Sequence, residues 1–440
     1  MSSASKQLAP SKAIARHNNW ALNIFFLSTL FILIFSVKAI QSWPPLIGKA
    51  SILLACILPV IMIGIFEFPA CLSKKTIPKE VLWVILIFIL GATSSLLSEN
   101  QLFSLKATVL FIASGPFILI TTIYLFKSTR NQTLFLWMIN LGLLCFSTFF
   151  LFYDFTNFDG YPYTNPYTNI WDPHSMRNPL PEGAALILLS AGPMIFLARK
   201  NSVASRLISV ISLILFITII VLLAKKGPIL SLIIIFLFWI IFIDLRFLKL
   251  LVGFVLLTGS LLYFSESTLS KLKSTIELNT SVTVRAELIF FGIHIFKQNP
   301  VWGIGSKAEL TPYLENYEIN FKSLMIEDIM VHENYFQQHL RKFKTFENIF
   351  LAFLVEMGGL FFITYFGGLL YILVRCLKIS YSPSTDIEML SLVSVIVGFL
   401  FISCTFDTLR FPNLNWMFHS LLGLMVNLRQ RSVREGSETN

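Results

Sequence analysis

The residues best suited to chemistry are the charged side chains of a long polar stretch, 266–346, which separates two strongly apolar parts of the chain. Arg285 stands at the start of an apolar helical stretch within it. Asn299-Pro300, Gly303 and Gly305 follow as a stop and a tight turn. A guanidinium binds phosphate oxygens through two parallel hydrogen bonds. A fixed cation, a helix and a turn at the water boundary are typical of a membrane enzyme that handles a lipid-linked anion.

Two further cations, Lys225 and Lys226, occupy a short turn before Gly227-Pro228. Adjacent helical positions point about 100° apart, so only one of the two lysines can point into a given cavity. That lysine and Arg285 would together hold a diphosphate, with the lysine acting as a point charge. The alternative is that both lysines reach toward lipid phosphates at the membrane surface.

Three further ionisable residues could carry chemistry, and Glu347 could act as a general base for an attacking hydroxyl. Glu347 begins an apolar run, and Glu356 lies nine positions later within it, about half a turn out of phase. Glu347 could instead complement a helix dipole. Glu356 is a functional candidate because it is ionisable inside a span, or else it pairs within the bundle. His332, in the polar stretch, is the third, although a lone histidine in a loop is usually an ordinary surface residue.

The sequence gives no indication of a metal or a cofactor. No grouping of His, Cys, Asp or Glu has metal-ligand spacing. Neither a phosphate-binding loop nor a dinucleotide fingerprint occurs. We therefore expect no metal and no cofactor.

The elements that must position these residues are membrane-spanning helices. Hydrophobic residues make up 55% of the 440 residues and charged residues 13%, which no soluble domain of this length matches. Each apolar run is close to the roughly 20 residues that cross a bilayer, and a span must satisfy its own backbone, so the runs are helices. The predicted fold class is an all-α polytopic membrane protein with about twelve spans. The runs are 20–40, 46–66, 82–98, 105–126, 134–153, 180–198, 206–224, 228–245, 249–265, 347–374, 388–406 and 414–427.

The basic residues near the ends of these runs predict the orientation. With the N-terminus in the cytoplasm, the cytoplasmic tails and loops hold eighteen Lys and Arg, against seven on the other side outside the long polar stretch. The polar stretch therefore faces the exterior. The net charge of +10 reflects this sidedness and requires no nucleic acid. Lys106, Arg177 and Arg410 are external cations that join Lys225 and Lys226 as candidates for binding an anionic substrate.

The predicted organisation is one membrane domain with an external cap. Residues 1–19 form a cytoplasmic N-tail and 20–265 the first nine helices. Residues 266–346 form a large, mostly helical cap between the ninth and tenth helices. Residues 347–427 form three more helices, and 428–440 form a cytoplasmic C-tail.

Two external segments have a further predicted role. Residues 284–298 are too polar and too short to span, and we expect this helix to lie along the membrane surface. The loop 154–179 is rich in Tyr, Trp, Asn and Asp. Aromatic faces and short amides suit sugar rings; alternatively, the loop is an interfacial aromatic belt with turn residues.

Three patterns between residues 281 and 360 carry a family resemblance. They are Val284-Arg285-Ala286-Glu287-Leu288, Asn299-Pro300-x-x-Gly303-x-Gly305, and Asn348-x-x-Leu351-x-x-x-x-Glu356-x-Gly358. With these patterns the chain resembles the O-antigen ligase and polymerase superfamily. About twelve spans with a large external loop between the ninth and tenth fit that family too. Outside 281–360 the likeness is one of topology only.

The resemblance implies a metal-independent, inverting glycosyltransferase whose donor is a glycan on undecaprenyl diphosphate. In the family, arginines at the outer edge of the membrane bind the diphosphate, and Arg285 matches one of them. Lys225 and Lys226 stand where the family has another arginine, so the residue differs and the charge is kept. Lys106 matches a basic residue near the start of the fourth span.

The main departure from the family concerns the general base. The family has a His before the Asn that Asn348 matches, and this chain has Glu347 there. A carboxylate is a weaker base than an imidazole unless burial strengthens it. Either Glu347 or His332 then assists the acceptor hydroxyl, with Asn348 and Glu356 among the substrate-binding residues. A relative with altered chemistry is a third possibility.

The predicted function is that of a ligase in the inner membrane of a bacterium. It would pass a glycan from undecaprenyl diphosphate to a sugar hydroxyl of lipid A–core on the periplasmic face, with membrane lipids around its spans. The first alternative is a polymerase that passes the glycan to another glycan repeat. An alternative of another class is a transporter of polysaccharide or lipid-linked sugar. Transporters usually show internal repeats and broken helices, neither of which the sequence indicates, and a one-sided cap favours an enzyme.

Overall fold

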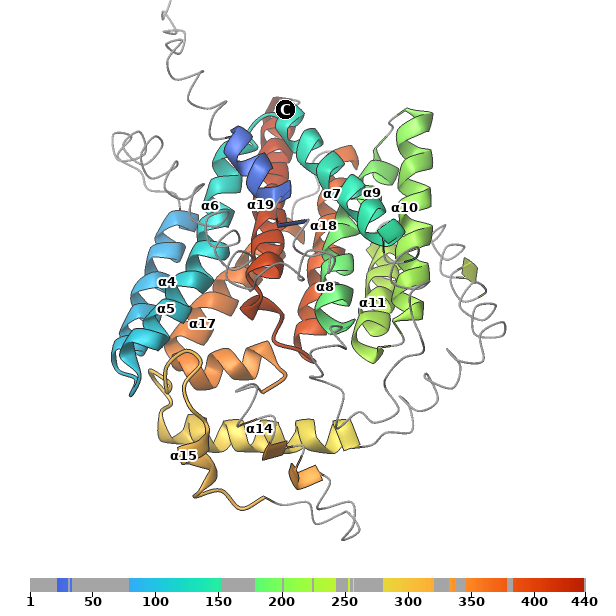
Figure 1. Ribbon diagram of the computed structural model, residues 1–440. Coiled ribbons are helices and arrows are strands. Elements are labelled where there is room, and N and C mark those ends of the chain that lie inside the picture. Colours follow the sequence, from blue (N-terminus) through green and yellow to red (C-terminus); the bar gives the residue numbers. More distant parts are fainter. Residues whose placement is uncertain are drawn as a thin grey trace, which may run out of the picture.

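The computed structural model of the chain shows a bundle of helices with two further helices at one end (Figure 1). The helices of the bundle are α4 (Lys79–Leu96), α5 (Gln101–Ser114), α6 (Pro116–Leu125), α7 (Thr129–Phe149), α8 (Pro179–Leu189), α9 (Ala191–Ala198), α10 (Val203–Leu222), α11 (Lys226–Phe242), α17 (Ile349–Leu377), α18 (Pro383–Ser403) and α19 (Pro412–Glu438). The end elements are α14 (Thr280–Gln298) and α15 (Thr311–Leu314), with a short 3-10 helix η5 (Thr408–Arg410) before α19. The structure describes residues 22–30, 32–33, 79–149, 151, 179–199, 202–223, 225–242, 252–253, 256, 280–319, 332–334, 336–337, 340, 346–377 and 383–438.

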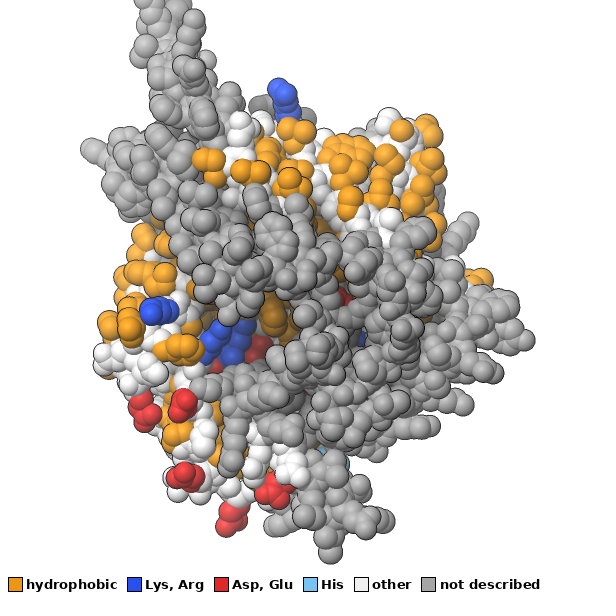
Figure 2. Space-filling view, viewed as in Figure 1, with side chains coloured by type: hydrophobic (Ala, Val, Ile, Leu, Met, Phe, Trp, Pro, Cys, Tyr) orange, Lys and Arg blue, Asp and Glu red, His pale blue; other side chains and the backbone are white. Residues whose placement is uncertain are grey.

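Helix α4 shows why the bundle suits a membrane. Leu82, Ile85, Leu86 and Ile89 recur at helical spacing and are 38–52% exposed, whereas Val84 on the opposite face is fully buried. A continuous apolar face of this kind is rare on a soluble protein. In Figure 2 the described surface of the bundle is largely hydrophobic, and acidic side chains gather toward the end that holds α14 and α15.

The prediction of an all-helical membrane protein is confirmed for the part of the chain that the structure describes. That part contains no strand, and five of its helical segments are long and apolar enough to cross a bilayer. The total of about twelve spans and the position of the cap between the ninth and tenth spans stay predictions. The run 46–66, most of 249–265 and the loop 154–178, which includes Arg177, lie outside the described residues. The five segments are 79–96, 101–125, 180–198, 203–221 and 349–377.

Helix α17 corrects two expectations. The tenth apolar run was expected to be a continuous helix, but it is broken at Gly358, whose φ of 82° and ψ of 169° are not helical. Its first part packs against α14, and the second part runs up the bundle beside α4 (Figure 1). The sequence did not indicate this break. Because the helix begins at Ile349, Glu347 precedes it, and the phase argument between Glu347 and Glu356 does not apply.

Helix α14 lies across the end of the bundle, and its position on the membrane surface stays a prediction (Figure 1). Val284, Leu288, Phe291 and Ile295 recur at helical spacing and are all fully buried. They form a second hydrophobic core, separate from that of the bundle, with the first part of α17. Phe290, on the opposite face, is 62% exposed. The cap is thus a small layer with its own core, fixed to the bundle through α17.

An ionic cluster ties helices together at the other end of the bundle, where the C-terminus lies (Figure 1). Arg199 donates two hydrogen bonds of 2.8 Å to the two oxygens of Glu388 and a third, of 3.0 Å, to Thr133. Arg431 adds a contact of 3.3 Å to the same carboxylate. The cluster joins α7, α9, α18 and α19 by placing two guanidiniums around one carboxylate.

Candidate active site

The glycines of the sequence pattern form a junction between two backbones. The segment after α14 runs alongside the break in α17, where Ile304 N–H donates to the Val355 carbonyl at 3.1 Å and Gly305 N–H to the Glu356 carbonyl at 2.8 Å. Gly303 and Gly358 have φ values of 70° and 82°, and a Cβ on either would collide with the facing backbone. Left-handed backbone favours glycine. The Gly303–Gly305 segment and the Gly358 segment, which are separate in sequence, therefore form a single junction between the cap loop and α17.

Glu356 lies at this junction rather than deep within a span. Its carboxylate is 4% exposed and accepts a hydrogen bond of 2.8 Å from the backbone N–H of Lys307. Arg410, from η5, donates to the other oxygen and also lies 3.5 Å from Asp407. Glu356 and Arg410, two of the predicted substrate-binding residues, thus form a buried ion pair with each other. This pair connects the cap loop, α17 and η5.

Arg285 and Glu347 form the second ion pair of the cap end. Arg285, in the second turn of α14, donates from Nε to Oε2 of Glu347 at 2.9 Å. The side chains are 31% and 16% exposed. Among the described residues, no hydrogen bond or ion pair to the two terminal nitrogens of Arg285 is present. A guanidinium held at Nε keeps the fork that binds two phosphate oxygens.

Glu347 has an unusual backbone. Its φ is 51°, which is a left-handed conformation. Among the described non-glycine residues, only Lys307 also has a positive φ. Such conformations cost roughly 1–3 kcal/mol and gather at functional sites. The next residue, Asn348, accepts hydrogen bonds at Oδ1 from the N–H groups of Phe350 (3.0 Å) and Leu351 (3.2 Å), so it caps α17. Asn348 therefore fixes where the helix begins and where Glu347 is presented.

Lys225 belongs to the same electrostatic group as Arg285. It is half-buried in the turn before α11. Burial, and secondly the charge of Arg285, lower the pKa of its ammonium. The repulsion means that the two cations lie within range of each other, although they are distant in sequence. An anionic ligand between them would relieve this repulsion.

The other predicted site residues are less closely associated with this group. Lys226 and Lys106 are both exposed, Lys226 as the first residue of α11 and Lys106 on α5. His332 is 4% exposed in the cap, so it cannot reach an acceptor unless the cap rearranges. Arg177 lies outside the described residues. Within the described part of the chain, no three His, Cys, Asp or Glu residues are grouped so as to hold a metal ion.

Sequence reasoning did not identify Lys307 or the turn before α5 as parts of a site. Lys307 follows Gly305 by two positions and has a φ of 54°. The pattern of two glycines predicted a turn, but not that a non-glycine residue after it would adopt a left-handed conformation. The turn at 97–100 carries no motif, and its proximity to the cap loop depends on the break in α17.

Comparison with known proteins finds one family similarity, in the middle of the chain. Residues 211–366 match the family model described as O-Antigen ligase. The matched segment contains Lys225, Arg285, Glu347 and the junction at Gly358. No curated protein gives a significant match to the chain. The segment 211–366, about a third of the chain, is thus similar to the O-antigen ligase family.

Proposed function

We propose that this protein is a glycosyltransferase that moves a glycan from undecaprenyl diphosphate to a sugar hydroxyl of lipid A–core. The family implies a glycosyltransferase-like enzyme with lipid-linked glycan substrates. The observation that carries the proposal is the grouping of Arg285, Lys225 and Glu347 at the cap end of the bundle. Two cations there repel each other, and the terminal nitrogens of one of them form no hydrogen bond or ion pair with described residues.

The reaction follows from these residue types. The acceptor oxygen attacks the anomeric carbon and forms the new glycosidic bond as the bond from that carbon to the diphosphate oxygen breaks. Attack opposite the leaving group inverts the configuration. The acceptor proton passes to the carboxylate of Glu347. The electron pair of the broken bond stays on the diphosphate, where Arg285 and Lys225 neutralise it. No step requires a metal ion.

We assign the base to Glu347 rather than His332. Glu347 is held beside Arg285 at 2.9 Å, so a base and a diphosphate-binding cation are next to each other. His332 is buried in the cap. The carboxylate thus has two tasks: before donor binding it orients the guanidinium through Nε, and during transfer it accepts the proton.

The location we propose is the inner membrane of a bacterium, with about twelve spans and the cap in the periplasm. Arg285, Lys225 and Glu347 lie at one end of the bundle. Arg199 and Arg431 lie at the opposite end, among the tails and loops that hold most of the Lys and Arg residues. Basic residues favour the cytoplasmic side. Two variants, one with a cysteine introduced at Glu315 and one at Gln430, test this by treatment of intact spheroplasts with a membrane-impermeant thiol reagent. We expect the cysteine at position 315 to be labelled and the cysteine at position 430 to stay unlabelled.

The activity is tested with purified protein in liposomes that contain the lipid-linked glycan and lipid A–core. We expect the glycan on the acceptor and free undecaprenyl diphosphate, in equal amounts, without an ion gradient. Movement of intact lipid-linked glycan across the bilayer, with no new glycosidic bond, would indicate a transporter instead.

Deletion of the gene separates ligase from polymerase. Loss of the surface polysaccharide ladder, with free lipid-linked polymer accumulating, is the result expected for a ligase. A single-repeat band on lipid A–core would identify a polymerase and overturn the assignment of the acceptor.

A further inference from the structure

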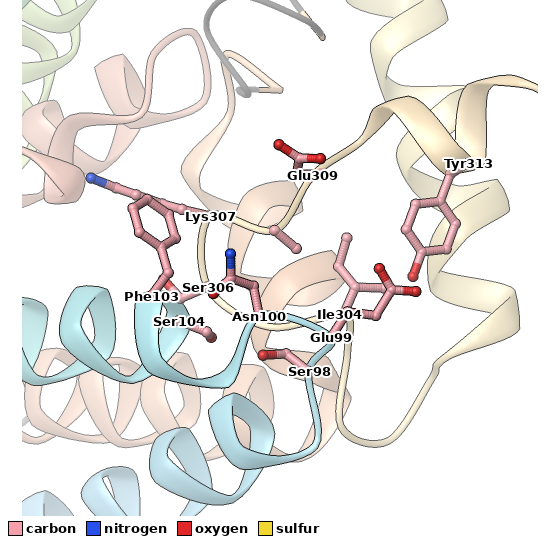
Figure 3. Close-up of a pocket in the computed structure, with 11 residues that line it drawn as sticks. Ser98, Glu99, Asn100, Phe103, Ser104, Ile304, Ser306, Lys307, Glu309 and Tyr313 are labelled. Atoms are coloured by element: carbon pink, nitrogen blue, oxygen red, sulfur yellow. The ribbon is translucent and has the colours of Figure 1, made fainter.

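A polar cavity lies apart from the cations and carboxylate of the proposed reaction. It has a volume of about 320 Å³ and is formed by the α4–α5 turn, the start of α5 and the segment from Ile304 to Tyr313 (Figure 3). No step of the reaction above uses these side chains. The lining residues are Ser98, Glu99, Asn100, Phe103, Ser104, Ile304, Ser306, Lys307, Ala308, Glu309 and Tyr313.

Ser104 is the first sign that this cavity receives a ligand. Its side chain is 2% exposed, and its Oγ has no hydrogen-bond partner among the described residues. The neighbouring hydroxyl of Ser98 donates to the carbonyl of Ser95 at 2.8 Å. A buried hydroxyl without a partner costs roughly 1–3 kcal/mol, and a ligand hydroxyl would supply the partner. A Cβ on Gly305 would collide with Ser98 and come within 2.9 Å of this oxygen, so the glycine lets the cap loop pack closely against the α4–α5 turn.

Asn100 is the second sign. It occupies the cap position of α5, yet its side chain makes no capping hydrogen bond. Asparagine at this position usually accepts from the helix N–H groups. Instead, the amide of Asn100 points into the cavity (Figure 3). Both a donor and an acceptor are thereby offered to a ligand.

The rest of the lining combines aromatic rings with carboxylates. Phe103 is 48% exposed and lies on one side of the cavity, with Tyr313 on the other (Figure 3). Burial, and secondly the charge of Glu99, raise the pKa of the Tyr313 hydroxyl, so that carboxylate lies near the ring. Glu309 is a second acceptor in the lining. Rings that contact an apolar C–H face, with amide, hydroxyl and carboxylate groups around them, match the chemistry of a pyranose sugar.

The cavity is too far from Arg285 to hold the sugar that reacts. Arg285 lies in the second turn of α14, and the cavity is lined by the segment beyond the far end of that helix (Figure 1). A rise of 1.5 Å per residue places that end roughly 20 Å from Arg285. The backbone N–H of Lys307, in the cavity wall, donates to Glu356, so the wall is fixed to the buried ion pair.

We propose that this cavity is a glycan subsite that binds one pyranose unit several sugars away from the reacting bond. The inference rests on the proposed function and adds a place where a distant part of the glycan is recognised. The sugar comes from the donor glycan or from the core of the acceptor, and the two sources offer the same chemistry to the cavity.

Steady-state transfer by Ser104→Ala and Phe103→Ala, with donor and acceptor varied separately, tests the subsite. We expect the KM of one substrate to rise about 3- to 10-fold for Ser104→Ala and about 10-fold for Phe103→Ala, with kcat little changed. A rise confined to the donor identifies the donor glycan, and a rise confined to the acceptor identifies the core. Leu102→Ala, which removes an adjacent side chain that is 66% exposed and outside the lining, is the matched control.

Thermal unfolding separates binding from a structural role. Removal of an unpartnered buried hydroxyl should leave the melting temperature of Ser104→Ala unchanged or raise it. If wild-type protein transfers glycan and both variants keep both KM values, the subsite is refuted and the proposed function stands.

If wild-type protein transfers nothing, the proposed function fails, and the subsite is tested by binding. Saturation-transfer NMR with oligosaccharide released from the cell's own surface polysaccharide should then show contact that Phe103→Ala abolishes and Leu102→Ala keeps. Equal signals from all three proteins, or no signal from wild type, would refute the subsite.

Discussion

The two ends of the bundle each hold arginine–glutamate contacts, but they use them differently. At the end near the C-terminus, Glu388 is matched by Arg199 through two hydrogen bonds of 2.8 Å and by Arg431 at 3.3 Å, and the carboxylate is 7% exposed. At the cap end, Arg285 meets Glu347 through Nε alone, and the arginine is 31% exposed. An arginine whose nitrogens are all used in hydrogen bonds to other helices holds those helices together. An arginine bound through Nε only keeps its terminal nitrogens for a ligand.

The cap end also derives its rigidity from a different source. There the break in α17 is closed by backbone hydrogen bonds to the segment of Gly303 and Gly305, and by the buried pair of Glu356 with Arg410. Arg285 and Glu347 are additional to this framework. The comparison therefore predicts that loss of Glu388 affects stability, whereas loss of Arg285 or Glu347 affects activity more than stability.

The largest expected effect is on stability at the C-terminal end. Glu388→Ala leaves the buried guanidinium of Arg199 uncompensated, and breaking a buried pair in this way costs about 3–5 kcal/mol. Thermal unfolding in detergent would measure it. Glu347→Ala is the counterpart at the cap end, where the partly exposed pair of Arg285 and Glu347 contributes about 1 kcal/mol or less. Equal melting temperatures for the two variants would remove the distinction between the ends.

The second effect is on transfer. Glu347→Gln keeps the shape and an oxygen that can accept from Arg285, but it cannot take a proton. Loss of a general base lowers rates about 10²- to 10⁴-fold, and we expect kcat to fall by about 100-fold or more with little change in donor KM. A raised donor KM at normal kcat would show that the carboxylate only orients Arg285.

The third effect concerns the junction. Gly358→Ala places a Cβ against the carbonyl of Val301 at a φ of 82°, and we expect a loss of about 1–3 kcal/mol or more in the free energy of unfolding. Gly367→Ala, further along α17, has nothing within 4 Å of the added Cβ. This control should be neutral or stabilising by up to about 1 kcal/mol. Similar losses of unfolding free energy in both variants would mean that the non-helical backbone at Gly358 has no particular effect on stability.

The smallest effect is on pH dependence. Burial and Arg285 lower the pKa of Lys225, so the free enzyme loses this positive charge at a lower pH than an ordinary lysine would. We expect kcat/KM for the donor to decline on the alkaline side in wild type and to hold to higher pH in Lys225→Arg. The stability of the free protein should change in the opposite direction, rising as Lys225 deprotonates, because its folded-state pKa lies below the unfolded one. Superimposable kcat/KM profiles would exclude Lys225 from donor binding.

Much of this arrangement could be predicted from residue patterns, and the rest could not for physical reasons. Residues 284–298 are too polar and too short to span, which predicted a helix along the membrane surface, and α14 lies across the bundle end. The break at Gly358 was missed because an apolar run has the same composition whether or not its helix is continuous. Glu356 was expected deep in a span, but its position depends on where the helix breaks.

The ion pair of Glu356 with Arg410 shows the same limit of sequence reasoning. Both residues were identified as candidates, but their pairing depends on how η5 packs against α17, which no local pattern encodes. The cavity near Ser104 was not predicted because short polar residues in a turn carry no period. Only the fold brings that turn against the segment after Gly305.

The measurement that tests the central claim most directly is glycan transfer by Arg285→Ala in liposomes, beside wild type, Arg285→Lys and Arg206→Ala. Arg206 is an exposed arginine in the first turns of α10, away from the cap, and controls for the loss of one positive charge. We predict that Arg285→Ala keeps its melting temperature within a few degrees and loses transfer by about 10²- to 10³-fold. Arg285→Lys should recover part of the rate, and Arg206→Ala should match wild type. Full transfer by Arg285→Ala would contradict the role of this guanidinium in holding the diphosphate.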